Sequence, residues 1–454
     1  QSVYAFAKIG YKDIIFLDIT GRNDWSSALA TPTSTDNVSF FYPSVAAAYI
    51  ASNHLDLPEW VSFAKARASW AQVGNDTDPY QTAGAFIAGT PFNSQPTFTS
   101  QDFISNGNLL PEKTSAIELG ADVRFFNDRV RLDVAYYNAL TENQIVSFPV
   151  AVSSGYNSQV VNGGAVRSTG VELLLGVTPV SKEDFSWTSF FNFTTNKSVV
   201  EELPEGADKI TLGFSRVYDN VNQTVWFQVE EGGEIGDMFG TGYLTNENGD
   251  FVLTEEGNFI ADNTLRIIGN ANPDFMLGWN NQFNYKNWEL SFLLDWRHGG
   301  ELVSRTLSLA GVGGQLEETE NRPSEGIVAE GVVNVGTDDN PVYETNTTAI
   351  SAESYYRQFY DRNHEVNNVY NASYVKLRQF SLGYTFNSSK DSGFLQKGRT
   401  FRVAFIGRNV FAISEIPHFD PEQFAVQGNQ ILGGVEDMSY PTARSFGLKL
   451  SYQL

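Results

Sequence analysis

Cysteine is absent from this 454-residue sequence. Without cysteine the chain forms neither a disulfide nor a thiolate metal site, so cysteine pairing says nothing about its redox compartment. A continuous apolar run of about 18 residues is also lacking, which excludes a transmembrane helix. This absence does not exclude a membrane, because strands of a membrane barrel cross in roughly ten residues and escape hydropathy windows.

Charged residues are scarce as well, at 18% of the chain, and basic residues are the scarcest, with 30 Lys and Arg against 53 Asp and Glu. The net charge of −23 argues against a nucleic acid partner, because its phosphates are repelled. Aromatic residues make up 14%. The length allows two or three soluble domains or one large barrel.

The sequence starts at Gln1 without the basic region and apolar core of a secretory signal. An alternating pattern begins almost at once, at Val3. We therefore expect the full polypeptide to have residues before Gln1.

A strict two-residue alternation is the most informative feature present. Between Trp288 and Trp296 the even positions are apolar, whereas the odd positions are polar apart from Leu293. Successive strand side chains point to opposite faces, so this segment has an apolar wall with an aromatic residue at each end. A tilted strand of this length rises roughly 20 Å, close to the apolar band of an outer-membrane barrel.

Thirteen segments show a strand pattern. They are 3–10, 14–22, 40–50, 64–73, 114–124, 130–141, 170–178, 185–197, 276–285, 288–298, 374–385, 401–409 and 445–452. Short connections alternate with long ones, and the long loops lie near 23–39, 74–113, 142–169, 198–275, 299–373 and 410–444. Outer-membrane barrels have this pattern, with short periplasmic turns and long extracellular loops.

The predicted fold class is therefore all-β, a transmembrane antiparallel barrel to which the whole of 1–454 belongs. Thirteen strands are an odd number, and an open sheet leaves bare edges in lipid, so we expect this to be the C-terminal part of a larger barrel. The segment 374–385 breaks the face pattern, because Lys376 and Arg378 share parity with Phe380 and Leu382. Either these two cations sit above the bilayer, or a bulge near Gln379 resets the face.

The two longest loops hold most of the charge. Loop 198–275 has a net charge of −12 and loop 299–373 has −8, which together account for −20 of the −23. Solubility of large exposed loops explains this excess, and cation or ligand binding is the alternative. Six loop aromatics are candidate contacts for substrate or a lid, with packing inside the loops as the other explanation: Trp25, Tyr218, Trp226, Phe227, Tyr355 and Tyr356.

Metal and catalytic signals are sparse. Four positions fit a calcium loop, namely Asn246, Asn248, Asp250 and Glu255, but the first ligand position is Leu244. A simple Asn-Gly turn is therefore favoured over a bound calcium ion, and no cofactor is expected. The acidic pair Asp338–Asp339 sits in a long loop rather than on the rigid elements that hydrolysis needs, so we do not expect an enzyme.

Ten stretches in order resemble the SusC/RagA-like family of TonB-dependent outer-membrane transporters of Bacteroidetes. They are Ile19–Asp24 with Phe41–Ala46, Arg67–Asn75, Leu110–Thr114, Ile117–Gly120, Asn162–Leu173, Ile235–Gly240, Ile268–Phe275, Tyr374–Arg378 with Ser381–Tyr384, Gly407–Phe411 and Tyr440–Arg444. The terminal Leu454 departs from the family's usual aromatic end. The order of the stretches makes the resemblance specific.

The resemblance implies a 22-stranded barrel, of which these are the last thirteen strands; the plug domain, the TonB box and nine strands lie outside this sequence. It implies nutrient import, of a glycan or a peptide, driven through TonB contacts made by the missing N-terminal segment. It also implies a SusD-like surface lipoprotein as partner, outer-membrane lipid around the wall, and allows a dimer of transporter–lipoprotein pairs.

Two other functions stay open. One is a barrel scaffold associated with secretion or surface assembly, without import, which a TonB box upstream of Gln1 separates from an importer. The other is a soluble all-β carbohydrate-binding protein, which solubility without detergent identifies.

Overall fold

A computed structural model describes residues 1–216, 224–337, 339–387, 399–416, 418–427 and 430–453. Within these residues, no helix is both long enough and apolar enough to span a membrane. The chain forms two compact units. The first comprises 1–210, 230–235 and 277–286, and the second comprises 211–229, 236–276 and 287–454.

Among the described residues, thirteen long strands form the framework, and each has its counterpart among the predicted segments. They are β1 (Ser2–Tyr11), β2 (Ile15–Trp25), β3 (Ser39–Ile50), β4 (Val61–Asn75), β8 (Glu112–Phe125), β9 (Val130–Glu142), β12 (Ala165–Ser181), β13 (Phe185–Glu202), β19 (Phe275–Tyr285), β20 (Trp288–His298), β27 (Tyr374–Asn387), β28 (Thr400–Ser414) and β32 (Ser445–Gln453). The prediction of thirteen strands is confirmed, and most strands extend a few residues beyond the alternating pattern.

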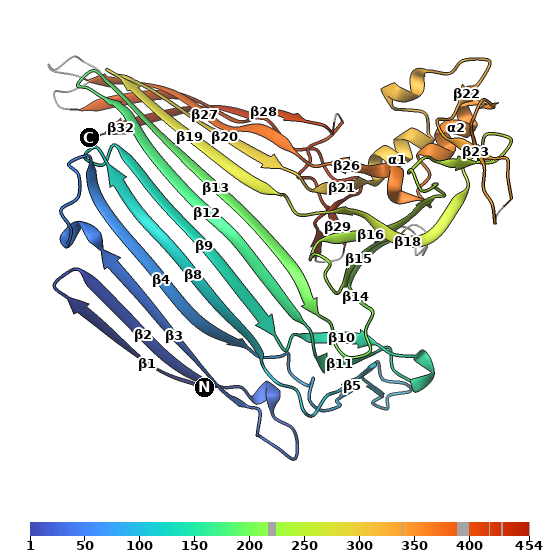
Figure 1. The fold of residues 1–454 in the computed structure, drawn as a ribbon, viewed down its shortest axis with the longest axis horizontal. Helices are drawn as coiled ribbons and strands as arrows, with labels where there is room; N and C mark the ends of the chain where they lie inside the picture. Colours follow the sequence, from blue (N-terminus) through green and yellow to red (C-terminus); the bar gives the residue numbers. More distant parts are fainter. Residues whose placement is uncertain (217–223, 338, 388–398, 417, 428–429, 454) are drawn as a thin grey trace. The chain divides into compact units, whose positions relative to one another are not determined.

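Within each unit, each long strand pairs with the next long strand along the chain (Figure 1). In the first unit the order is β1-β2-β3-β4-β8-β9-β12-β13-β19, and in the second it is β20-β27-β28-β32. The registered strand pairs of the framework are antiparallel. In the pair of β8 with β9, for example, Lys113 faces Glu142 and Phe125 faces Val130. This order is an up-and-down meander, in which paired strands are consecutive long strands even where a long loop separates them, as between β20 and β27.

The short connections are tight turns. Between β1 and β2, the Ile14 amide donates to the Tyr11 carbonyl over 2.9 Å. The two central residues, Lys12 and Asp13, both have positive φ, at 51° and 54°. Positive φ at both central positions defines the type I′ turn, whose twist matches that of the strands it joins.

The two faces of the wall separate by side-chain chemistry. On β12, Leu173 faces Val134 of β9 and Phe193 of β13, all apolar. The next residue, Leu174, faces Asp133 and Asn192 on the opposite, polar face. The polar face carries ion pairs across strands, such as the Arg67 guanidinium, which donates to both oxygens of Asp133 at 2.8 and 3.1 Å.

A bulge in β27 explains the segment that broke the face pattern. Gln379 pairs with Leu293 of β20, but the next pair joins Leu377 to Leu294, so Arg378 is the extra residue. Against β28 the irregularity has the opposite sense, because Leu377 pairs with Phe411 and Gln379 with Arg408, so that two residues of β28 lie opposite Arg378. Even-numbered residues before the bulge and even-numbered residues after it therefore lie on opposite faces of the strand. Of the two alternatives drawn from the sequence, the bulge near Gln379 is the one that the register shows.

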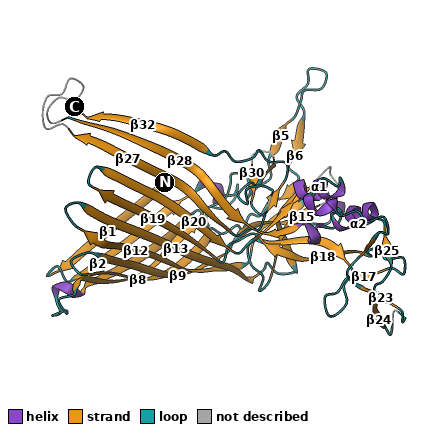
Figure 2. Ribbon diagram, turned by 90° about the horizontal axis from the view of Figure 1, so that it is seen from above, coloured by secondary structure: helices purple, strands orange, loops and turns teal. Residues whose placement is uncertain are grey.

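The long loops contain secondary structure that the alternation does not predict (Figure 2). The first unit adds β5 (Phe86–Ala88), β6 (Phe98–Ser100), β7 (Phe103–Ile104), β10 (Ile145–Pro149) and β11 (Ser158–Asn162). The remaining loop strands belong wholly or mostly to the second unit. They are β14 (Lys209–Arg216), β15 (Thr224–Glu230), β16 (Asp237–Tyr243), β17 (Val252–Leu253), β18 (Ala261–Asn270), β21 (Glu301–Ser304), β22 (Ile327–Val328), β23 (Val332–Asn334), β24 (Tyr343–Thr345), β25 (Ala349–Ile350), β26 (Val369–Asn371), β29 (Ala425–Gln427), β30 (Gln430–Leu432) and β31 (Val435–Glu436). The part of the second unit that the structure describes also contains the α-helices α1 (Arg305–Val312) and α2 (Ala352–Phe359).

These loop elements have hydrophobic cores of their own. In the second unit, one core is built from fully buried side chains of three separate long loops: Val225, Met238, Val303, Ala425 and Val435. Another core packs α1 against α2 through Leu307, Tyr356 and Tyr360. The three loops therefore fold together instead of extending independently into solvent.

A pair of adjacent leucines on β12 tests which face of the wall meets lipid. Leu173→Lys on the apolar face is expected to destabilise the full-length protein in lipid vesicles by about 2–4 kcal/mol, because a lysine at mid-depth loses its hydration. Leu174→Lys is the matched control, and its ammonium group gains Asp133 as a neighbour. Denaturant unfolding measures both variants. Equal stability losses would contradict the assignment of the faces.

Candidate functional site

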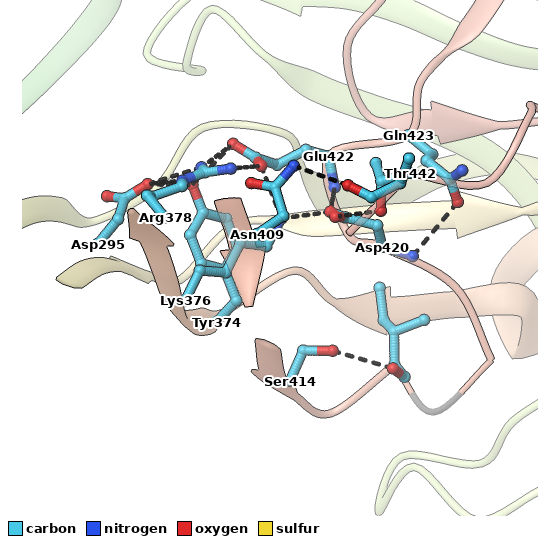
Figure 3. A network of polar contacts seen from close by, with 12 residues as sticks. Asp295, Tyr374, Lys376, Arg378, Asn409, Ser414, Asp420, Glu422, Gln423 and Thr442 are labelled. Atoms are coloured by element: carbon cyan, nitrogen blue, oxygen red, sulfur yellow. Dashed lines mark hydrogen bonds and ion pairs between the residues drawn. The ribbon is translucent and has the colours of Figure 1, made fainter. Parts of the chain in front are cut away.

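A network of charged side chains lies where β20, β27 and the segment 415–444 meet in the second unit (Figure 3). β27 supplies Tyr374, Lys376 and Arg378, and β20 supplies Asp295. The segment after β28 supplies Asp420 and Glu422. Residues 374, 376 and 378 share one face because the strand repeats every two residues, and the bulge ends this run at Arg378.

The Arg378 guanidinium connects the two acids on either side of it. Its Nε lies 2.7 Å from Asp295 Oδ2, and its two terminal nitrogens each lie 2.5 Å from an oxygen of Glu422. The Tyr374 hydroxyl donates to Glu422 Oε1 over 2.9 Å. A planar guanidinium donating two parallel bonds to a carboxylate fixes the orientation of both groups, so Glu422 is held in one position.

Lys376 is the most enclosed cation of the network, because its side chain is only 3% exposed. Its ammonium group pairs with Asp420 and with Glu422 Oε2, the latter over 2.6 Å. Asp420 also accepts a hydrogen bond from Thr442 Oγ1 at 2.9 Å. A buried ammonium group is tolerated only when it is paired, so Lys376 ties the segment 415–444 to the end of β27.

The environment of Glu422 shifts its pKa strongly. Burial by itself raises the pKa of this carboxyl, but hydrogen bonds from Arg378 and Lys376 outweigh burial and lower the pKa to about 2. Glu422 therefore stays ionised over the whole physiological range.

A cavity of about 480 Å³ adjoins this network. One side is the end of β28, including Phe411 and Ile413, and the other is the segment that carries His418, Gln423 and Thr442. Its volume lies within the range of about 300–1,000 Å³ that small-molecule sites occupy. Apolar walls next to hydrogen-bonding groups can bind an amphipathic solute or a short chain segment.

A second charged pair is buried in the interior of the loops. The Arg305 Nε lies 3.5 Å from Glu365 Oε1, and the side chains are 3% and 1% exposed. Arg305 also donates to the hydroxyl and the carbonyl of Ser215, each over 2.7 Å. Burial raises the pKa of Glu365 to about 7, against the opposing charge of Arg305. This pair connects three parts of the loop core.

The predicted contact residues lie in different places. Trp25 ends β2 in the first unit, and its side chain is exposed. Trp226 packs against Phe214 with ring centroids 5.4 Å apart, and Phe227 packs against the core that contains Met238. Tyr218 lies outside the described residues, as does Asp338. Contact of these residues with a substrate or a lid stays a prediction.

The neighbouring residues Tyr355 and Tyr356 of α2 have different surroundings. Tyr356 is buried, and its hydroxyl donates to the backbone carbonyls of Glu318 and Asn321 over 2.8 and 3.0 Å. Tyr355 is partly exposed and lines a pocket with Phe359. Only Tyr355 of this pair has a face available to a ligand.

The candidate calcium loop is a turn in this structure. Asn246 Oδ1 accepts hydrogen bonds from the amides of Asn248 and Asp250, each over 2.9 Å, and the Asn246 side-chain amide donates to Asp250. Glu255 is exposed further along the chain. Within the described part of the chain, no group of three His, Asp or Glu side chains is placed to hold a metal ion. The expectation of a turn without calcium, with a bound calcium ion as the alternative, stays a prediction.

The sequence pattern marked the two cations of the charged network but not their acidic partners. Lys376 and Arg378 stood out because they occupied positions that the alternation reserves for apolar residues. Their partner Glu422 lies 46 residues after Lys376 and 44 residues after Arg378, in a segment without periodicity. Two cations on a strand imply buried or lumen acids nearby, but only the fold identifies which acids.

The comparisons with known proteins agree with this architecture. The family model described as "TonB dependent receptor-like, beta-barrel" matches residues 1–295. The chain belongs to this family of outer-membrane receptor barrels, and the predicted barrel fold is confirmed.

Among relatives, TonB-dependent receptor P3 of Formosa agariphila is 27% identical over 480 residues, covering 99% of this chain and 45% of the relative. TonB-dependent receptor SusC of Bacteroides thetaiotaomicron is 24% identical, covering 92% and 40%. The chain thus spans less than half the length of these relatives. The resemblance to SusC-type receptors of Bacteroidetes is confirmed.

Among solved structures, the RagAB peptide transporter matches with a TM-score of 0.72 at 20% identity, covering 99% of this chain and 47% of that chain. The RagAB peptide importer in its "open-open" state matches with a TM-score of 0.70 at 19% identity, covering 99% and 46%. At this level of identity the likeness concerns the fold.

Removing the Lys376 ammonium group is expected to release the segment 415–444. Lys376→Met leaves Asp420 and Glu422 close together with less compensation, which costs about 3–5 kcal/mol for a buried pair. Digestion with a glutamate-specific protease then cleaves the segment at least about tenfold faster, because cleavage follows local opening. Lys449→Met, at an exposed position on β32, is the control. Unchanged cleavage in Lys376→Met would show that the network does not hold the segment.

The low pKa of Glu422 gives a pH signature. The folded pKa, about 2, lies below the ordinary value of 4.5, so the stabilisation is complete above pH 4.5 and is lost as the pH falls toward 2. The advantage of the wild type over Glu422→Gln, about 1–3 kcal/mol at pH 6, should therefore shrink at lower pH. Denaturant unfolding of both proteins at pH 6, 4 and 2.5 measures it. An advantage that does not change with pH would contradict this assignment.

Proposed function

We propose that the protein imports a nutrient, either an oligosaccharide or a peptide, across the outer membrane with energy supplied through TonB. The match of residues 1–295 to the TonB-dependent receptor barrel family carries the proposal. A wall with one apolar and one polar face suits a barrel that encloses an aqueous path.

The long loops face the cell exterior in this proposal, and the short turns face the periplasm. Short periplasmic turns and long external loops are the rule for such barrels, and the two kinds of connection alternate along this chain. The acid excess of loops 198–275 and 299–373 then lies in external water. The loops that share this core fold as one body, and its outer surface can bind substrate and partner.

A SusD-like surface lipoprotein is the proposed partner, covering the long loops. The similarity to TonB-dependent receptor SusC supports such a pairing, as does the fold likeness to the RagAB peptide transporter. TonB is proposed to act through the part of the protein that precedes this sequence. No catalytic step is proposed, since the family consists of receptors and transporters.

Deleting the gene is expected to abolish uptake of at least one peptide or oligosaccharide. Growth on single glycans or peptides, with transport of the labelled solutes, measures the loss, and a plasmid copy of the gene should restore it. A protonophore should stop uptake in the wild type, because TonB transmits energy from the inner membrane. Unchanged uptake of every candidate solute would contradict import and favour a scaffold role in secretion or surface assembly.

A further inference from the structure

A small pocket of about 240 Å³ lies in the second unit, away from the charged network. Its walls are the aromatic side chains Phe251, Phe259, Tyr355 and Phe359. Gly249, Asp250, Glu330 and Gly331 complete the lining. The volume is below the roughly 300 Å³ at which drug-sized sites begin, so the pocket suits a single long side chain.

Helix α2 places two of the rings. Tyr355 and Phe359 are four residues apart and therefore lie on one face of the helix, where their rings stack with centroids 5.7 Å apart. Phe259 lies within 6.1 Å of Tyr355 and 6.4 Å of Phe359. Its backbone amide donates to Gln358 Oε1 over 2.9 Å, which ties the segment to the helix. The aromatic walls are thus held in place by α2.

The rings of Phe251 and Phe259 pack against a buried tyrosine, Tyr243. The Tyr243 ring is only 3% exposed and lies 4.9 Å from Phe259 and 6.3 Å from Phe251. Gly331 has a φ of +154°, and a Cβ there would lie 2.5 Å from the Phe251 carbonyl oxygen. Only glycine allows this close backbone approach, which also permits the 2.8 Å bond from the Val332 amide to that oxygen.

The charge of the lining is negative. Asp250 and Glu330 are both exposed. Over the described ranges, neither carboxylate forms an ion pair with a lysine or an arginine, although Asp250 accepts a neutral hydrogen bond from Asn246. Burial is the main cause that raises the pKa of the Tyr355 phenol, and the neighbouring groups Tyr356 and Glu330 add to the effect, so the charge of Glu330 reaches the pocket wall.

Rings and carboxylates together select for positive charge. The face of an aromatic ring attracts an ammonium or guanidinium group, and a carboxylate at the rim neutralises it. An anion is repelled, whereas a neutral sugar gains no charge attraction from the two carboxylates. The aliphatic stem of a lysine or arginine can lie along the rings while its charged end reaches the rim.

We propose that this pocket binds the lysine or arginine side chain of a peptide substrate. The inference deepens the proposed import function and rests on it, because it assigns a peptide with a basic side chain to the transporter. The acid excess of the surrounding loops favours the approach of such a peptide.

Binding of three matched peptides to the purified full-length protein tests the proposal. The probe is a hexapeptide with one central lysine and a neutral dye at one end, and its partners carry norleucine or glutamate instead of lysine. Fluorescence anisotropy should show the lysine peptide binding at least about fivefold more tightly than the norleucine peptide, and the glutamate peptide binding least. Equal binding of the lysine and norleucine peptides would overturn the proposal.

Substitutions of pocket residues test whether the preference for the lysine peptide arises in this pocket. Glu330→Gln is expected to weaken binding of the lysine peptide about threefold to tenfold, because it removes the charge at the rim while keeping the volume. Phe359→Leu is expected to have a similar effect, because it replaces an aromatic ring with an aliphatic side chain. Glu344→Gln, an equal charge change at an exposed position on β24, is the control and should leave binding within about twofold. An equal effect of Glu344→Gln, or none from Glu330→Gln, would overturn the assignment.

Failure of this inference is distinguishable from failure of the proposed function. If the deletion strain loses uptake but the lysine peptide binds no better than the norleucine peptide, the pocket assignment is wrong and import stands. If uptake is intact in the deletion strain while the lysine peptide binds selectively through Glu330, the pocket is confirmed and import is wrong.

Discussion

The structure depends on backbone hydrogen bonding between neighbouring strands. A polar backbone group inside a lipid bilayer has no water to bond with, so every amide and carbonyl needs a partner within the protein. Within each unit, pairing each long strand with the next long strand along the chain meets this requirement. The ladder leaves the side chains free to differ between faces, which is why Leu173 and Leu174, adjacent in sequence, have such different neighbours.

The loops follow another principle, because water can satisfy their backbone. They carry most of the acidic charge of the chain, and they fold around small cores of their own. Burying charged groups in such cores is tolerated only in pairs. Lys376 with Asp420 and Glu422, and Arg305 with Glu365, meet this condition and join segments that are far apart in sequence.

The wall could be predicted from sequence and the loops could not, for physical reasons. A strand with two different environments has a period of two residues. This period predicted all thirteen long strands, and its break near Gln379 gave a bulge as one of two explanations. Loop strands such as β17 and β22 have two residues each, too few for any period. The partners of Lys376 and the rings around Tyr355 come together only when distant segments fold against one another, so the sequence marked single residues without their neighbours.

The extra residue at Arg378 has a consequence for how this wall can vary among relatives. It divides β27 into two parts of opposite phase, so the loop end and the rest of the strand are patterned independently. Gaining or losing one residue at this position would change which side chains the loop end presents while the remaining strand keeps its lipid contacts. The same event in the middle of an unbulged strand such as β9 would turn every following side chain to the wrong medium. Length differences of one residue should therefore be tolerated at this joint and be rare elsewhere in the wall.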